Sequence, residues 1–480
     1  MAATFHVEHF GCRAARADGE AVSECLRAAG LGDASPPEAD VVVVNTCSVT
    51  AEADRAARAF IRRAHRLNPE ARIVATGCYA QRAPHELASM HGVAAVVGNS
   101  HKAFAPAIIL GLGLSGSRQT AAQPELAGPS LVSVESLISG SARAPIWADD
   151  RFAHSFIEEA QMAPGAQTRP NLKIQEGCGN RCTFCVIPST RGPSKSLPHT
   201  VVLRQVEGFV AAEGKELVLS GINLGRWGRD FSSSEVSPSR ALSGLVRAIL
   251  ERTTLPRLRL SSIEPMDWDA ELIGLMAGFG NPATGPARLA RHAHLPLQSG
   301  SDAVLRRMHR RYRPWHYVEK VEALVRACGS ALTLGADVMV GFPGETDAEF
   351  EETLALVRAL PFGYLHLFPF SPRPATIAWA LHAERPVVPA AVAERMKALR
   401  ALAAEKTETH RRRFVGCELE TITLHTPAEL GALGRTAALT ENFLPVEVAG
   451  RLEANRLVRV RVTGLTAEGV LGAAIGENPA

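Results

Sequence analysis

The chain has 480 residues, of which 46% are hydrophobic, and its formal net charge is +3. This length predicts two to four domains, and the mild charge neither requires nor excludes a nucleic-acid partner. The chain has no run of about 18 apolar residues, and its first residues lack the basic and apolar regions of a secretory signal. We therefore expect neither a membrane span nor secretion.

The first hundred residues alternate between short apolar segments and amphipathic ones. Strands are expected at 5–10, 39–46, 72–77 and 93–98, and helices at 19–30 and 51–67. This alternation is typical of βαβ units, which form an open parallel sheet with helices on its faces. The following stretch is rich in Gly, Ser, Gln and Pro and has no periodicity, which predicts a linker or insertion.

The alternation resumes near residue 169 and predicts a partial (β/α) barrel. Its strands are expected at 171–176, 216–223, 257–264, 291–297, 332–341 and 364–370. A long charged helix follows, and the tail then consists of short β-type segments separated by glycines, which predicts a small β-barrel. The expected fold class is therefore α/β with a C-terminal β-barrel. The expected divisions are an N-terminal domain at 1–108, a linker or insertion at 109–168, the (β/α) barrel at 169–395, a connecting helix at 396–414 and the β-barrel at 415–478.

Three cysteines lie within eight positions just after the first barrel strand. Cys178, Cys182 and Cys185 have the spacing C-x3-C-x2-C. A structural zinc site normally has four protein ligands, and no second C-x2-C pair follows, although half of a zinc site remains an alternative. Three thiolates that leave one position open suit a 4Fe–4S cluster whose fourth iron binds something else.

Three further cysteines share a position relative to their strands. Cys12, Cys47 and Cys78 each follow a predicted strand of the N-terminal sheet. The carboxyl ends of parallel strands meet at one edge, where open α/β sheets build their sites, so these residues predict a second three-thiolate cluster. The alternative for each of them is an ordinary small core residue. We expect the remaining cysteines to be structural: Cys25, Cys328 and Cys417.

The contiguous motif resembles that of the radical S-adenosylmethionine superfamily, and the whole pattern resembles the methylthiotransferases. The supporting stretches include "ATGCYAQ", "CTFCVIP", "RLRLSSIEP", "HLPLQSGSD", "GADVMVGFPGET" and "LTENFLPV". In detail they are closest to the branch that acts on N6-threonylcarbamoyladenosine at position 37 of tRNA. Departures from the family pattern are Ala15, Ala17 and Gly179 near the cysteines, and Ala375 and Ile377 in one loop.

The resemblance implies two 4Fe–4S clusters and S-adenosylmethionine as cofactors. The cluster at Cys178, Cys182 and Cys185 would generate a 5′-deoxyadenosyl radical, and the cluster at Cys12, Cys47 and Cys78 would supply the methylated sulfur. Alternatives with the same chemistry act on isopentenyladenosine at position 37 of tRNA or on a ribosomal-protein aspartate. A non-enzymatic alternative is an iron–sulfur protein that binds RNA and uses its clusters structurally.

Other residues are predicted to contact S-adenosylmethionine: Phe184 because the resemblance implies an aromatic there whose backbone lies beside the adenine, and the rest because they lie near the ends of barrel strands. These are Phe184, Ser220, Gly221, Asn223, Ser262, Glu264, Gln298 and Asp337. A second set is predicted to contact RNA through charge or stacking. It comprises Arg306, Arg307, Arg310, Arg311, Arg435, Asn442 and Phe443. The expected partners are a tRNA anticodon stem-loop and a reduced electron donor such as flavodoxin or ferredoxin. We expect a cytoplasmic protein without a stable protein partner.

Overall fold

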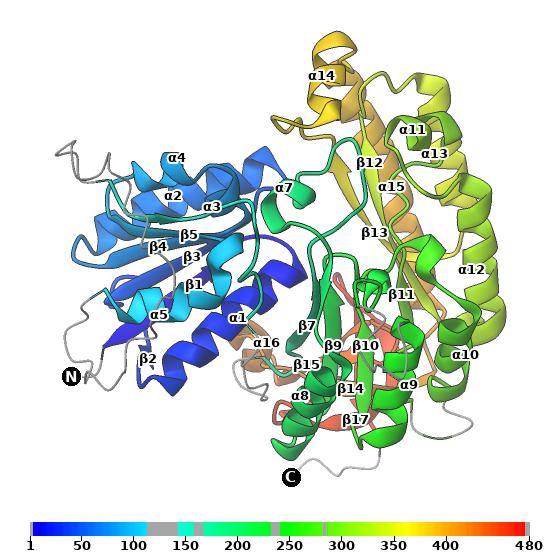
Figure 1. Cartoon of the computed structure of the whole chain (residues 1–480). Coiled ribbons are helices and arrows are strands. Elements are labelled where there is room, and N and C mark those ends of the chain that lie inside the picture. The colour runs from blue at the N-terminus through cyan, green and yellow to red at the C-terminus, as the bar shows by residue number, and fades with distance from the viewer. Residues whose placement is uncertain are drawn as a thin grey trace. The chain divides into compact units, whose positions relative to one another are not determined.

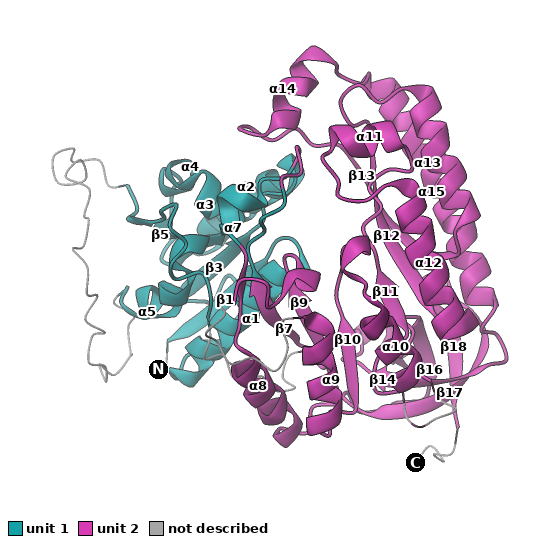
Figure 2. Cartoon of the chain, turned by 45° about the vertical axis from the view of Figure 1, so that its right-hand side comes forward, with its two compact units in different colours: residues 1–160, 176–180, 185–193 teal, residues 161–175, 181–184, 194–480 magenta. Residues whose placement is uncertain are grey.

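The computed structural model describes residues 3–112, 143–157, 167–231, 241–281, 285 and 287–475. The chain forms two compact units (Figure 2). Unit 1 comprises residues 1–160, 176–180 and 185–193, and unit 2 comprises residues 161–175, 181–184 and 194–480. Among the described helices, none combines the length and the apolar character that a membrane crossing requires.

Unit 1 contains a parallel sheet of six strands in the order β2-β1-β3-β4-β5-β6. Its long strands are β1 (Thr4–His9), β3 (Val41–Thr46), β4 (Arg72–Gly77) and β5 (Val93–Gly98), and its two-residue edge strands are β2 (Gly32–Asp33) and β6 (Ile146–Trp147). The strand β6 falls inside the segment predicted to be a linker or insertion. Other residues of that segment, 113–142 and 158–166, lie outside the described residues.

Alternate residues of the central strands bury opposite faces of this sheet. Val42 and Val44 share a core with α2 (Ala51–Leu67), whereas Val41 and Val43 share one with α1 (Arg13–Ala28) and α5 (Ala105–Leu110). Because both faces are covered, β3 begins with four consecutive valines. The unit also contains η1 (Asn99–Phe104) and the short helices α3 (Cys78–Arg82), α4 (Pro84–Ala88) and α7 (Ile187–Arg191).

Unit 2 contains the predicted (β/α) barrel, whose strands run in parallel (Figure 1). Two sheets, β10-β9-β7-β8 and β11-β12-β13, are linked by a parallel bridge between Leu258 and Leu289. The barrel strands are β7 (Asn171–Glu176), β9 (Glu216–Gly221), β10 (Arg257–Leu260), β11 (His292–His294), β12 (Thr333–Val340) and β13 (Phe362–Pro369); β8 (Lys195–Ser196) is a short addition. Among the described strands, no pairing joins β13 to β7 or β8, so this barrel is partial.

Helices separate these strands, as the periodicity predicts. They are α8 (His199–Ala211), α9 (Leu242–Arg252), α10 (Ala270–Phe279), α11 (Asp302–Arg307), α12 (Pro314–Cys328), α13 (Asp347–Ala359), α14 (Ile377–Glu384) and α15 (Pro389–Arg412). The start of α13 is fixed by a capping box in which Thr346 and Glu349 satisfy each other's backbone N–H groups.

The tail forms a closed five-stranded barrel in the order β14-β15-β16-β18-β17. Its strands are β14 (Glu418–Thr423), β15 (Arg435–Thr440), β16 (Pro445–Ala449), β17 (Leu457–Leu465) and β18 (Val470–Ala474), with α16 (Ala428–Ala432) between the first two. Val458, Val460 and Val462 alternate with exposed residues along β17 and fill the barrel core. The predicted fold class is therefore confirmed.

Candidate active site

Cys12, Cys47 and Cys78 follow three neighbouring parallel strands. Cys47 and Cys78 come directly after β3 and β4, and Cys12 lies three residues beyond β1. Cys47 and Cys78 are buried, and Cys12 is exposed. The structure therefore brings the three residues to one edge of the sheet of unit 1, as the sequence predicted.

Glycines allow the chain to turn closely before these cysteines. Gly11 has φ +116°, and a Cβ placed on it would lie 2.5 Å from the Cβ of Cys47. Gly77 has φ +97°, and its Cβ would lie 2.3 Å from the backbone oxygen of Thr46. A side chain at either position would be strained and would push neighbouring strand ends apart.

The sulfur atoms of this set accept hydrogen bonds from the protein. The Sγ of Cys78 accepts from Arg191 Nε at 3.2 Å and from Asn99 Nδ2 at 3.4 Å, and the Sγ of Cys47 accepts from the backbone N–H of Val49 at 3.5 Å. Burial, followed by the nearby Cys78 and Cys12, raises the pKa of Cys47 to about 12. Binding of a metal cluster releases the thiol proton, and the metal then stabilises the buried thiolate. The donor set therefore fits an iron–sulfur cluster.

Arg191 belongs to a buried network of four charged side chains in unit 1. Its Nη1 donates to Glu176 at 2.7 Å and to Asp18 at 3.0 Å, while Lys102 Nζ lies 2.6 Å from Asp18 and 3.5 Å from Glu176. Each of the four is at most 4% exposed. Two cations balance two carboxylates, so the network holds Arg191 against Cys78 without a net buried charge.

The contiguous cysteine motif begins at a third strained glycine. Gly177 has φ +67°, and a Cβ placed on it would lie 2.0 Å from the backbone oxygen of Pro193. The Sγ of Cys178 accepts from the N–H of Asn180 at 3.4 Å, and the Sγ of Cys185 accepts from the N–H of Ile187 at 3.5 Å. Each sulfur thus faces the amide two residues further along the chain, which stabilises thiolate character.

Cys182 has a charged donor of its own in unit 2. Arg310 Nη1 donates to its Sγ at 3.3 Å, and Arg310 Nη2 lies 2.7 and 2.6 Å from the two carboxylate oxygens of Glu264. Arg310 is only 7% exposed. Thr183, which follows Cys182, is hydrogen-bonded to the backbone of Arg307 and Met308. The tip of the cysteine loop is therefore fixed to the end of α11.

Comparison with known proteins identifies the family. The model of the uncharacterised protein family UPF0004 matches residues 4–98, and that of the radical SAM superfamily matches residues 172–357. The threonylcarbamoyladenosine tRNA methylthiotransferase MtaB of Aquifex aeolicus is 33% identical over 426 residues, which are 88% of this chain and 91% of that protein. The chain belongs to the methylthiotransferase family. MtaB of Bacillus subtilis is 32% identical over 462 residues, covering 96% of this chain and 94% of that protein.

Methylthiotransferases with another substrate in their name are also similar to this chain. The tRNA-2-methylthio-N(6)-dimethylallyladenosine synthase of Cereibacter sphaeroides is 31% identical, with 98% of each chain covered. Among solved structures, the radical S-adenosylmethionine methyltransferase TsrM of Kitasatospora setae, with cobalamin and a 4Fe–4S cluster bound, has a TM-score of 0.52 at 16% identity, covering 80% of this chain and 75% of TsrM. That likeness shows a shared fold.

The residues predicted to contact S-adenosylmethionine lie around the barrel of this methylthiotransferase. Most follow or end a strand at its carboxyl end, whereas Asp337 lies within β12, and Phe184 makes an edge contact with Phe342. Within the described part of the chain, the buried Ser220 Oγ and Gln298 Oε1 have no hydrogen-bond partner, and Gln298 has φ +64°. Buried polar atoms of this kind are expected to meet a polar ligand. Contact with the cofactor remains a prediction for the whole set: Phe184, Ser220, Gly221, Asn223, Ser262, Glu264, Gln298 and Asp337.

The residues predicted to contact RNA divide into exposed and buried ones. Arg306 and Arg311 are exposed, and Arg435 is partly buried in an ion pair with Glu447. Arg307 is held by Glu349 through two contacts of 2.8 and 2.7 Å. Arg310 is bonded to Cys182, so its position favours a role beside that cysteine in place of one on RNA.

The turn at 441–444 lies between the tail barrel and the (β/α) barrel, although the sequence suggested RNA contact there. Asn442 is fully buried and donates to the backbone oxygen of Ala331 at 3.0 Å. Phe443 stacks on His292 with ring centroids 4.2 Å apart, and Arg259 lies over the same ring. These contacts assign Asn442 and Phe443 to domain packing, because their side chains are engaged within the protein.

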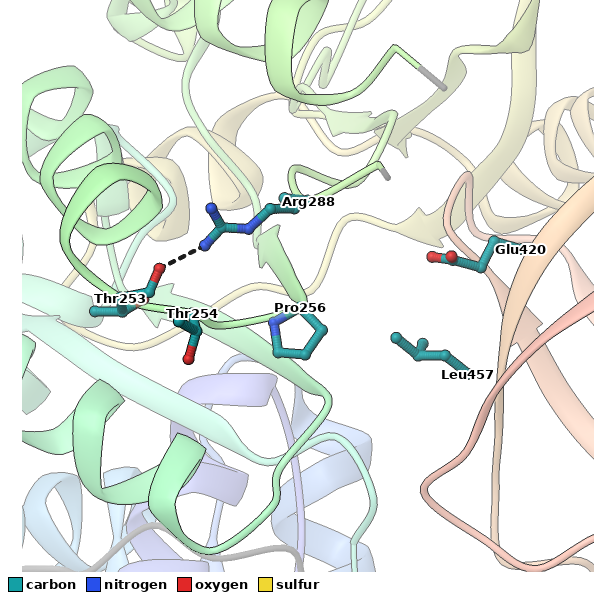
Figure 3. Close-up of a pocket in the computed structure, with 6 residues that line it drawn as sticks. All are labelled: Thr253, Thr254, Pro256, Arg288, Glu420 and Leu457. Carbon is teal, nitrogen blue, oxygen red and sulfur yellow. Dashed lines mark hydrogen bonds between the residues drawn. The ribbon is translucent and has the colours of Figure 1, made fainter. Parts of the chain in front are cut away.

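A cavity of about 320 Å³ opens between the same two barrels (Figure 3). It is lined by Thr253, Thr254, Pro256, Arg288, Glu420 and Leu457, and Arg288 donates to the backbone oxygen of Thr253 at 2.8 Å. Several of these residues precede β10 and β11, whereas the cysteine motif follows β7. The cavity therefore lies at the amino ends of the barrel strands, where this fold does not place its chemistry.

Sequence reasoning did not find Asp18, Lys102, Glu176 or Arg191. Charged residues in helices and loops usually mark a solvated face, and nothing in the spacing of these four showed that they converge. The one available signal was the proximity of Glu176 and Arg191 to the cysteine motif.

Proposed function

We propose that this chain is a radical S-adenosylmethionine enzyme that adds a methylthio group to C2 of N6-threonylcarbamoyladenosine at position 37 of tRNA. The observation that carries the proposal is the presence of two three-cysteine sets, one in a loop after a barrel strand and one at a sheet edge. Each set leaves room for a ligand other than cysteine on a 4Fe–4S cluster. Two clusters and S-adenosylmethionine are therefore the proposed cofactors.

The target position explains why such cofactors are needed. The hydrogen at adenine C2 is not acidic, so a side-chain base cannot remove it usefully. A 4Fe–4S cluster held by Cys178, Cys182 and Cys185 supplies, when bound, the electron that cleaves S-adenosylmethionine to a carbon radical. Arg310 holds Cys182 in place, and Ser220 and Gln298 offer buried polar atoms to the nucleoside or amino-acid part of the cofactor.

In the set formed by Cys12, Cys47 and Cys78, Arg191 has the role that Arg310 has beside Cys182. Its guanidinium donates to Cys78 and is itself fixed by two carboxylates, so it orients the sulfur and withdraws electron density from it. We infer that the second cluster is held by Cys12, Cys47 and Cys78. Arg306, Arg311 and Arg435 remain candidates for phosphate contacts with a tRNA anticodon stem-loop.

The proposed substrate is inferred from the names of the similar proteins. Those named for threonylcarbamoyladenosine include proteins 33% and 32% identical, and one named for dimethylallyladenosine is 31% identical. The second candidate substrate is thus isopentenyladenosine at the same position. A reduced flavodoxin or ferredoxin would supply the electron, and tRNA modification would place the protein in the cytoplasm.

The test is expression in a bacterium that lacks its own methylthiotransferases, followed by mass spectrometry of digested tRNA nucleosides. A mass increase of one methylthio group on threonylcarbamoyladenosine supports the proposal, provided that Cys47→Ala and Cys182→Ala each abolish it. The same increase on isopentenyladenosine alone would establish the second candidate. Unmodified tRNA, with chain expression verified, would overturn both.

A further inference from the structure

Five polar side chains form a continuous hydrogen-bonded series, called the polar chain, across the last three barrel strands. They come from the neighbouring strands β11, β12 and β13 (Figure 1): His292, His294, Asp337, Tyr364 and His366. Alternate residues of β12, Leu334, Ala336 and Val338, are buried and apolar. The outer face of a (β/α) barrel packs under its helices, so the polar face of these strands is the interior one.

The hydrogen bonds run from the buried end of this polar chain to its open end. Tyr364 Oη lies 2.8 Å from His292 Nε2 and 2.9 Å from His294 Nδ1. Asp337 Oδ2 lies 3.2 Å from His294 Nε2, and Asp337 Oδ1 lies 3.2 Å from His366 Nδ1. Exposure of the side chain rises from 8% at His294 through 25% at Asp337 to 61% at His366.

The partners fix where the protons lie. Burial alone would raise the pKa of Asp337, but the bonds from His294 and His366 hold it well below its usual value, so this carboxylate only accepts. His294 therefore donates through Nε2 and accepts the Tyr364 hydroxyl proton through Nδ1. His366 donates through Nδ1, which leaves Nε2 as its second polar atom.

A metal ion is the other occupant that such side chains suggest. Ligand atoms of His294, Asp337 and His366 lie within 4.8 Å of one another. Asp337 is already paired with both histidines through direct contacts of 3.2 Å, however, so its oxygens have partners without an ion. The polar chain therefore needs no cation, and its exposed end is His366.

The polar chain lies close to the cluster ligand within unit 2. The backbone oxygen of His294 accepts from the N–H of Ile263 at 3.0 Å. The next residue, Glu264, holds Arg310, whose guanidinium bonds the sulfur of Cys182. A substrate that enters the barrel beside this loop would meet His366 inside it.

We propose that His366 and the polar chain behind it form the subsite for the N6 substituent of the target adenosine. This inference rests on the proposed function and deepens it. A threonylcarbamoyl group carries an N–H, a hydroxyl and a carboxylate, whereas an isopentenyl group carries no polar atom. His366 Nε2 accepts from the N–H or hydroxyl when the ring is neutral and donates to the carboxylate when it is protonated. Such a site discriminates against an apolar analogue, because binding that analogue would leave polar groups unpaired. Asp337 and Tyr364 are positioning residues, since they act through the two histidines.

The test measures binding of two synthetic anticodon stem-loop RNAs that differ only in the substituent on adenosine 37, threonylcarbamoyl or isopentenyl. Affinity is measured by fluorescence anisotropy on the full chain with its clusters reconstituted. His366→Leu is expected to weaken binding of the threonylcarbamoyl RNA about tenfold, the value of one hydrogen bond to a charged or polar group, without weakening binding of the isopentenyl RNA. Tyr364→Phe is expected to reduce the same preference by a smaller factor. The control is His85→Leu, an exposed histidine on α4 of unit 1, which should change neither affinity.

The outcomes separate this inference from the proposed function. Equal effects of His366→Leu on both RNAs, or no effect on either, would overturn the inference, as would stoichiometric zinc in the purified chain that His366→Leu removes. If the unmodified chain methylthiolates only isopentenyladenosine, the proposed substrate fails. If it methylthiolates threonylcarbamoyladenosine and His366→Leu retains the full preference, only the subsite is wrong. Circular dichroism and a thermal unfolding curve that match those of the unsubstituted chain show that the His366→Leu variant has folded.

Discussion

The two three-cysteine sets have the same composition but different origins. Cys178, Cys182 and Cys185 lie in one loop, and two of their sulfurs face backbone amides two residues further on. Cys12, Cys47 and Cys78 are separated by more than 30 residues each and meet because β1, β3 and β4 are parallel neighbours. The first set is specified by local spacing, and the second is specified by the topology of a sheet.

Each set also has one buried arginine that donates to a cysteine sulfur. Arg310 bonds Cys182 and is balanced by Glu264, whereas Arg191 bonds Cys78 within a network of four charges. Cys182 therefore relies on one arginine–carboxylate pair, while Cys78 relies on an arginine that three further buried charges hold in place. The dispersed set should accordingly be more sensitive to changes in the surrounding fold.

The largest expected difference between the sets is in the reaction step that each supports. Cys182→Ala should abolish S-adenosylmethionine cleavage, because the proposed function assigns radical generation to the loop motif. Cys47→Ala should retain cleavage and lose only the methylthio product. Each variant should lose about half of the iron of the reconstituted chain, since the proposed function assigns one 4Fe–4S cluster to each set. Iron analysis and 5′-deoxyadenosine measurement check this. Loss of cleavage in both variants would show that the two sets do not act separately.

The next prediction concerns the arginines. Arg191→Leu should lower the free energy of unfolding by roughly 3–5 kcal/mol, because it leaves Asp18 and Glu176 buried with Lys102 alone. Arg310→Leu should cost less, since its partner Glu264 is 19% exposed and can be solvated. The matched control is Arg151→Leu, whose side chain is 77% exposed and whose loss should cost less than about 1 kcal/mol. Denaturant unfolding measures all three, and a cost for Arg191→Leu as small as that of the control would contradict the network.

A further comparison is between two residues of the tail that the sequence associated with RNA. Phe443→Ala should lower the free energy of unfolding by about 2 kcal/mol, because its partly buried ring stacks on His292. Arg435→Ala should instead leave stability within about 0.5 kcal/mol and weaken tRNA binding. Denaturant unfolding and a tRNA binding assay distinguish the roles, and weaker RNA binding by a fully stable Phe443→Ala variant would restore the RNA role of that residue.

The smallest predicted effect concerns pH and the helix that precedes the tail barrel. Burial, followed by the charges of Arg413 and Arg411, lowers the pKa of His410 from 6.5 to about 4. His410 is therefore neutral in the folded chain, while the unfolded chain takes up a proton as the pH falls below about 6.5. This contribution to stability is complete above that pH and decreases between pH 6.5 and 4.

We expect His410 to account for a loss of about 1 kcal/mol between pH 7 and pH 5.5. The His410→Gln variant should lack this part of the pH dependence, because glutamine can still bond Thr333 but does not titrate. Denaturant unfolding at the two pH values measures the change in the free energy of unfolding. The same change in both proteins would show that His410 does not contribute.

Several features of this protein follow from the sequence alone. The spacing of Cys178, Cys182 and Cys185 is local, so folding was not needed to recognise it. The sequence pattern predicted the bounds of β4, β5 and β7 without error, because β4 and β5 are largely apolar and end at glycines, and β7 ends just before the cysteine motif. It also placed Cys12, Cys47 and Cys78 after strands, and a parallel sheet then requires that they share an edge. The short strands β2, β6 and β18 were missed, since segments of two to five residues carry little periodicity.

Only the tertiary structure decided which charged residues support the sites. Arg191, Arg310 and Lys102 occur in stretches whose composition is typical of solvated surfaces, yet each is buried against a carboxylate. The turn containing Asn442 and Phe443 carries an aromatic and a polar residue, as RNA-binding turns do, but its contacts lie with the (β/α) barrel. An ion pair or a ring stack depends on which distant residue comes within about 4–6 Å. That distance is set by the packing of strands and helices, which local sequence patterns do not contain.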